Sequence, residues 1–407
     1  MNSKTGYKIT QIGEIPEEWQ VTPLGKIARE IKLKNDSKDN FIVFAVTKHS
    51  GLVPSLHYFK KRVYSQDLSK YKIIKKEQFA YSPIHLNEGS IGLLETENKG
   101  LVSPLHVVFE FLPEANPRFF KYLLKSHRFL SIYSHLPQGS VERRGSILFR
   151  EFAKIHVQLP PLKEQNKIAS ILSTVDDAIQ KTNETIQKTR ELKKGLMQQL
   201  LTKGIGHTKF KQTEIGEIPE EWEIVRLGEI IAHEKGRKPK TLLDRVEQNT
   251  LPYLSAETLR TETLTQWARE TGEVMKVNSD DIILIWDGFY CGDSFIGFEG
   301  ILSSTMIKIE PKKPSLDKRF LFYFLKTCFK ELNSKISGMY LKHVNKSVFE
   351  SLKLPLPPLS EQRKIASILS VIDGKIEKEK ERKEQLEKLK KGLMQDLLTG
   401  RVRVKAD

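Results

Sequence analysis

The sequence predicts a mixed α/β protein built from two similar halves, each closed by a long helix, with the two helices paired as a coiled coil. The first observation behind this prediction is an octapeptide, IGEIPEEW, which occurs at 12–19 and again at 215–222. The second is a longer segment, PPLKEQNKIASILSTVDDAIQ at 160–180, which returns with small changes as PPLSEQRKIASILSVIDGKIE at 357–377. Head and tail recur in the same order, which indicates a duplicated unit rather than a repeated phrase.

Each half starts with the octapeptide, which we expect to form a short helical turn. Pro16 and Pro219 suit the first position of such a turn, and the glutamates that follow suit its electropositive start. Trp19 and Trp222 are then expected to be packed anchors.

The middle of each half predicts strands followed by an aromatic helix. Apolar, β-branched runs at 41–46, 105–111 and 281–286 are separated by Gly, Pro and Asn. RFFKYLLKS at 118–126 and RFLFYFLKT at 319–327 are the corresponding helical segments. Elsewhere the two middles share little identity, so the halves are expected to keep one fold while differing in the surfaces that act.

A long helix closes each half. No proline occurs from Glu164 to Leu201, and apolar residues or threonines recur at alternating spacings of four and three, the pattern of a coiled-coil seam. A helix of about 38 residues would be roughly 57 Å long at ~1.5 Å per residue. The second helix repeats the pattern without insertion or deletion, although Glu379 and Lys383 interrupt its seam. The expected seam residues are Ile168, Leu172, Val175, Ile179, Ile186, Ile365, Leu369, Ile372, Ile376, Leu386 and Leu393.

The repeats also predict the domain boundaries. A first domain with its repeated head at 10–28 is followed by a helix, a linker with a second domain whose head is at 213–231, and a second helix with a tail. The expected ranges are 1–159, 160–203, 204–356 and 357–407.

Composition favours a polyanionic partner inside the cell. The chain has 67 Lys and Arg against 51 Asp and Glu, a net charge of +16, which favours nucleic acid. No apolar run approaches the ~18–20 residues of a membrane span, and the N-terminal segment lacks the apolar core of a signal peptide. Cys291 and Cys328 are too few for a disulfide framework. We therefore expect a cytoplasmic protein with buried thiols and no membrane partner.

Sequence signatures of catalysis were not found. The chain has no GxxxxGK[ST] loop for nucleotide phosphates, no HExxH zinc helix and no NPP followed by an aromatic residue, which adenine methyltransferases carry. Its histidines and cysteines do not cluster at metal-ligand spacings. We expect no catalytic residue, no metal site and no cofactor in this chain.

Head and tail motifs together resemble those of one protein family. IPEEW stands at 15–19 and 218–222, followed by LPPLKEQNKIASIL at 159–172 and LPPLSEQRKIASIL at 356–369. This arrangement of IPxxW and LPPLxEQxxIAxxL, in both halves and in order, resembles the specificity (S) subunit of type I restriction-modification systems. The resemblance covers essentially the whole chain.

The resemblance implies a fold and a function. Each middle would be a target recognition domain that reads one half of a bipartite sequence in double-stranded DNA. The helices would form an antiparallel coiled coil that sets the gap between the half-sites. Two modification (methyltransferase) subunits and the restriction (translocase/nuclease) subunits would assemble with the chain. S-adenosylmethionine, ATP and Mg²⁺ are then expected only in those partners.

DNA-contacting residues are expected on exposed turns of the middles. Reading bases takes Arg or Lys for guanine and Asn or Gln for adenine, whereas charge without such geometry holds phosphates. The basic loop GRKPK at 236–240 is therefore expected to bind phosphate rather than bases. The candidates are Lys48, His49, Ser82, His85, Asn87, Ser90, Gln138, Ser140, Arg143 and Arg144 in the first half, and Arg237, Lys238, Lys240, Ser255, Glu257, Trp286, Asp287, Tyr290, Lys342, His343, Asn345 and Lys346 in the second.

Two alternatives remain open at this point. The chain could be a self-contained nuclease or methyltransferase whose catalytic centre is unrecognised, or a coiled-coil scaffold without DNA preference. The acidic, tryptophan-bearing heads suit protein partners better than DNA, and the resemblance implies that the modification subunits dock on the repeated segments. Docking is accordingly expected at Trp19, Trp222, Glu164, Gln165, Glu361 and Gln362.

Overall fold

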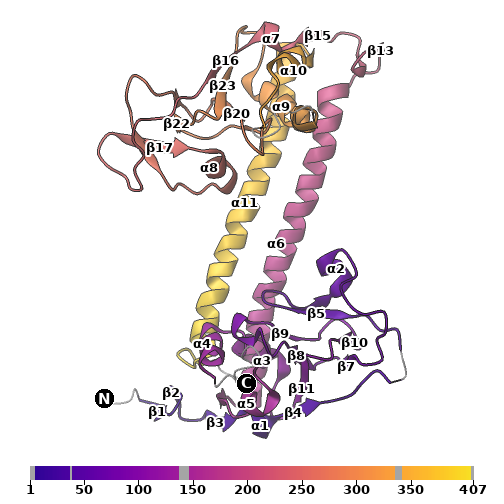
Figure 1. Cartoon of the computed structure of the whole chain (residues 1–407), viewed down its shortest axis with the longest axis vertical. Coiled ribbons are helices and arrows are strands. Elements are labelled where there is room, and N and C mark those ends of the chain that lie inside the picture. The colour runs from indigo at the N-terminus through magenta and orange to yellow at the C-terminus, as the bar shows by residue number, and fades with distance from the viewer. Residues whose placement is uncertain (1–4, 37–38, 137–145, 335–341, 405–407) are drawn as a thin grey trace. The chain divides into compact units, whose positions relative to one another are not determined.

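The computed structural model describes residues 5–36, 39–136, 146–334 and 342–404. The chain forms two compact units, the first made of Met1–Asn183 with Arg382–Asp407 and the second of Glu184–Glu381. The boundaries fall within the long helices α6 (Leu162–Lys203) and α11 (Leu359–Leu397), which Figure 1 shows in magenta and yellow. Each unit therefore contains part of both helices.

The head of each unit is a β-hairpin, not the expected helical turn. In the first unit, β1 (Tyr7–Thr10) pairs antiparallel with β2 (Gly13–Pro16). Gly13 takes a φ of 106°, which allows the tight reversal between the strands. Ladder pairing with β1 holds β2 extended as far as Pro16, and a turn closed by Trp19 N–H donating to the Pro16 carbonyl (3.0 Å) follows. The second unit repeats the hairpin with β13 (Phe210–Thr213) and β14 (Gly216–Pro219).

A short ladder then joins the head of each unit to the strand before its long helix. β3 (Gln20–Pro23) pairs with β12 (His156–Leu159), and β15 (Glu223–Arg226) pairs with β24 (Lys353–Leu356). The IPxxW segment of each unit is thereby brought beside the start of the LPPLxEQ segment.

The core of the first unit lies on a four-stranded antiparallel sheet in the order β4-β11-β8-β9. Phe79 stacks on Phe109 with ring centroids 5.1 Å apart, and both are almost fully buried. The further elements are the ladders β5–β6 and β7–β10 and several short helices. Their bounds are α1 (Leu24–Ile27), β4 (Ala28–Ile31), β5 (Phe44–Thr47), β6 (Gly51–Pro54), α2 (Ser55–Phe59), β7 (Lys72–Lys75), β8 (Phe79–Tyr81), η1 (Leu86–Glu88), β9 (Ile91–Leu93), β10 (Lys99–Val102), β11 (Val107–Phe111) and α5 (Phe149–Phe152).

The second unit has an equivalent sheet, in the order β16-β23-β20-β21, and a second four-stranded sheet in the order β18-β17-β22-β19. The β17–β22 pair is parallel. The buried run IILI forms β20, as the sequence predicts. The bounds are α7 (Leu227–Ile230), β16 (Ile231–Lys235), β17 (Thr250–Leu254), α8 (Ala256–Thr261), β18 (Trp267–Arg269), β19 (Lys276–Val277), β20 (Ile282–Ile285), β21 (Ser294–Phe295), β22 (Gly300–Leu302), β23 (Met306–Pro311) and α10 (Lys346–Ser351).

The aromatic helices differ between the units. In the second unit, α9 (Lys318–Ser334) is continuous and buries eight side chains. In the first unit, α3 (Pro117–Leu123) ends and α4 (His127–His135) starts after Ser126, whose ψ of 152° is extended. The similar sequences at 118–126 and 319–327 thus predict both helices but not this break.

The long helices α6 and α11 pack together, and they do so antiparallel. In the first unit the Lys390 ammonium lies 2.6 Å from the Asp176 carboxylate, and in the second the Lys193 ammonium lies 2.5 Å from that of Asp373. The early part of each helix therefore meets the late part of the other. Among the described residues, no helix is long and apolar enough to cross a membrane. The seam residues Ile168, Leu172, Val175, Ile186, Ile365, Leu369 and Ile376 are buried, and Ile179, Ile372, Leu386 and Leu393 are half-buried.

Candidate nucleic-acid interface

Equivalent loops of the two units carry many of the predicted DNA-contacting residues. The loop at 82–90 follows β8, and the loop at 286–293 follows β20. Both strands occupy the third position in their sheets, next to β11 and β23 respectively. The two units thus present different side chains from one place on the same framework.

In the first unit, the loop at 82–90 exposes only part of the predicted set. Ser82 and Ser90 are buried, and the Ser82 N–H donates to the Ser90 carbonyl at 2.9 Å, which closes the base of the loop. His85 and Asn87 are exposed. The His85 Nδ1 atom lies 3.0 Å from a Glu88 carboxylate oxygen. Of the predicted residues in this loop, His85 and Asn87 are therefore the ones that a ligand can reach.

A second turn of the first unit lies against this loop. Lys48 and His49 are exposed on the turn between β5 and β6. A Cβ atom added at Gly89 would come 3.4 Å from the Lys48 carbonyl oxygen, which shows how closely the two loops approach. The structure therefore brings the predicted residues at 46–51 and 82–90 together. The further candidates Gln138, Ser140, Arg143 and Arg144 lie outside the described residues.

Lys125 contacts the turn between β5 and β6, and it was not among the residues predicted from the sequence to contact DNA. Its ammonium donates to the His49 carbonyl at 3.2 Å. Burial, together with the nearby Lys121 and Lys390, lowers the pKa of Lys125 to about 8. The equivalent Lys326 of the second unit instead pairs with a carboxylate, that of Asp293, at 2.8 Å. The offset between the aromatic helices matches these two lysines, whereas the difference between their partners is seen only in the structure.

In the second unit, the loop at 286–293 meets α8 and the segment at 342–346. The Asp287 carboxylate pairs with the Lys235 ammonium at 2.8 Å, and Asp287 forms an isolated bridge with His343. The Arg260 guanidinium lies over the Tyr290 ring, 3.3 Å from its centroid. Lys342 lies 4.9 Å from the centroid of the Phe289 ring. Arg260 and Phe289 thus join the predicted group.

Several predicted residues of this unit have local structural roles. Ser255 caps α8 by accepting from the Thr258 N–H at 3.1 Å, and Asn345 caps α10. Trp286 is half-buried, stacked 5.7 Å from His233. Glu257 and Lys346 remain exposed, and Lys346 lies 3.7 Å from Glu350.

The predicted phosphate-binding loop lines a surface pocket of about 590 Å³. Lys238, Lys240 and Arg269 contribute positive charge to it. The Lys240 ammonium pairs with Glu273 at 3.0 Å, so part of that charge is balanced. Arg237 lies outside the pocket lining, 3.9 Å from Glu234.

The residues expected to dock partners are engaged inside their own units. Trp19 and Trp222 are fully buried, and their indole N–H groups donate to Glu164 at 2.9 Å and Glu361 at 3.0 Å. The two family motifs, IPxxW and LPPLxEQ, thus bind each other through tryptophan and glutamate. These indoles offer no surface to a partner.

The glutamines of the same motifs position the loop that precedes the aromatic helix. Gln165 accepts from the Asn116 N–H at 2.7 Å and donates to the Pro160 carbonyl at 2.8 Å. Gln362 accepts from the Asp317 N–H at 2.8 Å and donates to the Pro357 carbonyl at 2.8 Å. Each Glu-Gln pair therefore fastens the sheet-bearing part of its unit to the first turn of a long helix.

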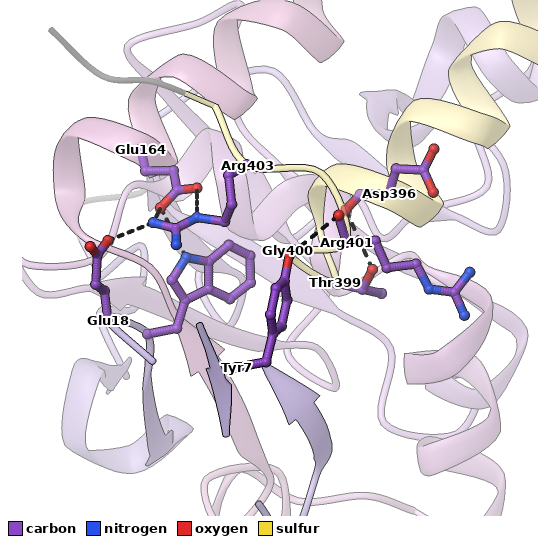
Figure 2. A network of polar contacts seen from close by, with 9 residues as sticks. Tyr7, Glu18, Glu164, Asp396, Thr399, Gly400, Arg401 and Arg403 are labelled. Atoms are coloured by element: carbon purple, nitrogen blue, oxygen red, sulfur yellow. Dashed lines mark hydrogen bonds and ion pairs between the residues drawn. The ribbon is translucent and has the colours of Figure 1, made fainter. Parts of the chain in front are cut away.

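Figure 2 shows how the tail after α11 closes the first unit. The Arg403 guanidinium contacts Glu164 through Nε (2.9 Å) and Nη2 (3.1 Å), and Nη2 also contacts Glu18 at 2.6 Å. The Tyr7 hydroxyl donates to the Gly400 carbonyl at 2.8 Å. The carboxylates raise the pKa of Arg403 further. The tail after α11 therefore returns onto the first unit.

In the second unit, the glutamate that binds the tryptophan is contacted by the linker that follows α6, rather than by the tail that follows α11. We call this contact between tail or linker and the Trp–Glu pair the junction of each unit. His207 lies four residues after α6 and contacts a Glu361 carboxylate oxygen at 2.9 Å through Nε2. Gly204 takes a φ of 66° and Gly400 one of 74°, and a Cβ atom added at either would press on the tryptophan of its unit. His207 and Arg403 therefore hold equivalent positions.

A tyrosine, an aspartate and a lysine join each aromatic helix to both long helices. The Tyr122 hydroxyl donates to Asp176 at 2.8 Å, and Lys390 pairs with that aspartate. In the second unit, the Tyr323 hydroxyl donates to Asp373 at 2.8 Å, and Lys193 completes the group. Burial, and then hydrogen bonding to the aspartate, raises the pKa of Tyr122 well above its usual value. Each recognition domain is thereby fixed to the helix pair of its unit.

Nothing in the part of the chain described here suggests a metal centre. No group of three His, Cys, Asp or Glu side chains could hold an ion among those residues. Cys291 and Cys328 are free and buried. Burial raises the pKa of the Cys328 thiol to about 12, which makes it a poor nucleophile.

Comparisons with known proteins agree with these features. Residues 16–191 and 219–388 match the family model described as "Type I restriction modification DNA specificity domain". The chain is 33% identical to the putative type I restriction enzyme MjaX specificity subunit of Methanocaldococcus jannaschii, over 98% of this chain and 97% of that protein. It is 43% identical to the MjaVIII specificity subunit of the same organism, over 47% of this chain and 45% of that one. A solved S subunit of a type I restriction-modification system, from M. genitalium, is similar in fold, with a TM-score of 0.60, 16% identity and coverage of 96% of this chain and 97% of that one.

Proposed function

The chain belongs to the family of type I restriction-modification DNA specificity subunits, and we propose that each of its units reads one half of a bipartite site in double-stranded DNA. Specificity is the non-catalytic part of such an enzyme, and the catalytic cofactors belong to partner subunits. The observation that carries the proposal is the pair of loops at 82–90 and 286–293. They leave equivalent strands of equivalent sheets but carry unlike side chains. Two different half-sites need such a difference.

The contacts to each half-site follow from exposure and charge. In the first unit we assign DNA contacts to Lys48, His49, His85 and Asn87, which the structure exposes. In the second unit we assign them to the loop at 286–290 and the segment at 342–346, with the pocket around Lys238 binding phosphate.

The long helices are proposed to set the gap between the half-sites. The Tyr–Asp–Lys groups and the Glu-Gln pairs fasten each domain to the helices, so a change of helix length would be passed on rather than absorbed. Deleting four residues within 175–190 is expected to shorten the unspecified gap and to leave both half-sites unchanged. Altered half-sites in the methylome would contradict this role.

The partners are proposed to be two modification subunits and the restriction subunits of the same system. The chain matches the type I DNA specificity domain, a solved structure similar in fold is described for complex assembly of a type I system, and the heads offer an acidic face for protein docking. Glu17 and Glu18 in one unit and Glu220 and Glu221 in the other are exposed, beside the buried tryptophans. The cytoplasmic location expected from the sequence is part of this proposal, because the target is cellular DNA.

A domain exchange tests the modular reading of DNA. Replacing 29–158 by the equivalent segment of another family member, in cells that carry the partner subunits, should change one half-site in the methylome. A change in both half-sites would contradict the assignment of one half-site to each unit. Cleavage or methylation of DNA by the purified chain alone would favour a self-contained enzyme instead.

A further inference from the structure

The loop after β20 presents an aromatic side chain to solvent in a prepared conformation. The Phe289 side chain is 69% exposed, and the adjacent Tyr290 is 37% exposed. The next residue, Cys291, is fully buried and anchors the loop. Gly288 takes a φ of 108° and donates its N–H to the Lys342 carbonyl at 2.7 Å. The backbone on both sides of Phe289 is therefore fixed before any ligand binds.

Each of the two rings has a cation at its face. Lys342 lies 4.9 Å from the Phe289 centroid and Arg260 lies 3.3 Å from the Tyr290 centroid. The rings contact each other edge to face, with centroids 4.9 Å apart. Aromatic faces stack on bases, and lysine and arginine bind phosphates, so this combination suits nucleic acid. A single exposed apolar residue is common on a protein surface, whereas two adjacent rings that each have a cation at the face, on a prepared loop, are not.

The equivalent loop of the first unit also exposes an apolar side chain. Ile84 follows β8 by three residues and is 50% exposed, whereas Phe289 follows β20 by four. Both loops therefore combine an apolar tip with polar neighbours. Proteins that kink duplex DNA insert phenylalanine or isoleucine between base steps in this way.

We propose that Phe289 inserts between two base pairs of the half-site read by the second unit and unstacks that step, while Lys342 and Arg260 bind the flanking phosphates. The inference rests on the proposed function. It adds that this half-site is recognised partly by how readily it deforms. Flexible pyrimidine–purine steps are favoured at the point of insertion.

The test uses the full complex with its methyltransferase subunits and duplexes that carry the site mapped by methylome sequencing. The fluorescent base 2-aminopurine replaces an adenine at successive steps of that half-site. Wild-type complex should raise its fluorescence at one step. Phe289→Ala should abolish the rise and weaken binding by roughly 5- to 150-fold, the range for losing one stacked base. Phe289→Trp should retain the rise.

Two control variants separate insertion from other effects. Val246 is 66% exposed elsewhere in the same unit, so Val246→Ala should change affinity less than about twofold. Lys342→Ala should lower the slope of log affinity against log salt by about one, which Phe289→Ala should leave unchanged.

Three outcomes would overturn the proposal. One is specific binding by the wild-type complex without a fluorescence rise at any step. Another is a Phe289→Ala complex that keeps both affinity and the rise. The third is a Phe289→Ala chain that no longer binds its methyltransferase subunits but still raises the 2-aminopurine fluorescence. That result would show that the ring contacts a protein partner rather than DNA. If the wild-type complex showed no sequence-specific binding at all, the proposed function itself would fail.

Discussion

Replacing Arg403 by alanine should loosen the closure of the first unit without affecting the second. Arg403 makes two contacts with Glu164 and one with Glu18. The Glu164 side chain is only 4% exposed, whereas those of Arg403 and Glu18 are 35% and 70% exposed. The contact with Glu164 therefore dominates the energy, because exposed pairs contribute ~0–1 kcal/mol.

The free-energy cost of Arg403→Ala depends on which hydrogen-bond partners Glu164 retains. Removing one partner of a fully buried ion pair costs ~3–5 kcal/mol. Here the Trp19 indole still donates to Glu164 at 2.9 Å, and the vacated space admits water. We therefore expect a loss of about 2 kcal/mol, close to that of a hydrogen bond to a charged group. Such a loss increases local opening by roughly 30-fold.

Hydrogen exchange measures this opening locally, which suits a chain of two units. Peptides covering 7–19 and 398–404 should exchange roughly 30-fold faster in Arg403→Ala, while those from the second unit should not change. His207→Ala is the matched control, since His207 contacts Glu361 from a covalent linker. Hydrogen exchange in the peptides of the second unit that surround His207 should increase much less in His207→Ala. Unchanged exchange in 7–19 would show that Arg403 does not hold the junction.

Four further substitutions probe other contacts. Tyr122→Phe and Tyr323→Phe should each destabilise their own unit by about 2 kcal/mol in urea unfolding, because each removes a hydrogen bond to an aspartate. The Tyr323 hydroxyl also contacts Ser370 at 3.2 Å, so its loss should be the larger; no loss in either variant would contradict the role of these groups. Burial and nearby Lys72 lower the pKa of His106 to about 4, so its proton binds the unfolded chain more tightly. Above pH 6.5 the imidazole is neutral in both states, so the free energy of unfolding of the first unit should not depend on this group. As the pH falls towards 4, that free energy should decrease by at most about 3 kcal/mol, and His106→Gln should flatten the decrease. Lys238→Ala should reduce the salt slope of DNA binding by about one without altering the methylated sequence.

Local sequence patterns predicted those helices and strands whose conformation is decided mainly by burial of apolar side chains. The proline-free, four-three spacing from Glu164 to Leu201 predicted α6, and the apolar run at 281–286 predicted β20, because burial alone decides such segments. The octapeptide was misjudged for the opposite reason. Pro16 and the glutamates after it favour a helical turn locally, but ladder pairing with β1 holds Gly13–Pro16 extended. The hydrogen bonds of the hairpin with the neighbouring strand β1 decided its conformation.

The candidate sites could be predicted only as segments. The turns at 46–51 and 82–90 were both identified, but their contact depends on how β5, β6 and β9 pack, which no local pattern encodes. Buried Ser82 and exposed His85 stand three residues apart, so composition could not separate them. Phe289 was missed although Trp286 and Tyr290 of the same loop were predicted, because no local pattern shows which aromatic side chain of a loop is most exposed. Aligning the halves by the offset of their aromatic helices matches Lys125 with Lys326, but the pairing of Lys326 with Asp293 depends on how the loop after β20 packs and is not given by the alignment.

The contacts of Arg403 with Glu164 and of His207 with Glu361 close the same kind of unit through different connections of the chain. The second unit is a continuous segment, Glu184–Glu381, in which the linker after α6 brings His207 to Glu361. The first unit combines Met1–Asn183 with Arg382–Asp407, so its junction must join Arg403 to Glu164 across 239 residues. Closing so long a loop costs conformational entropy that a linker of a few residues avoids. A guanidinium with three contacts, in place of an imidazole with one, compensates part of that cost. The first unit can therefore close only after the second has been synthesised, and the strength of its closure lies in the tail residue with the most charge-assisted contacts.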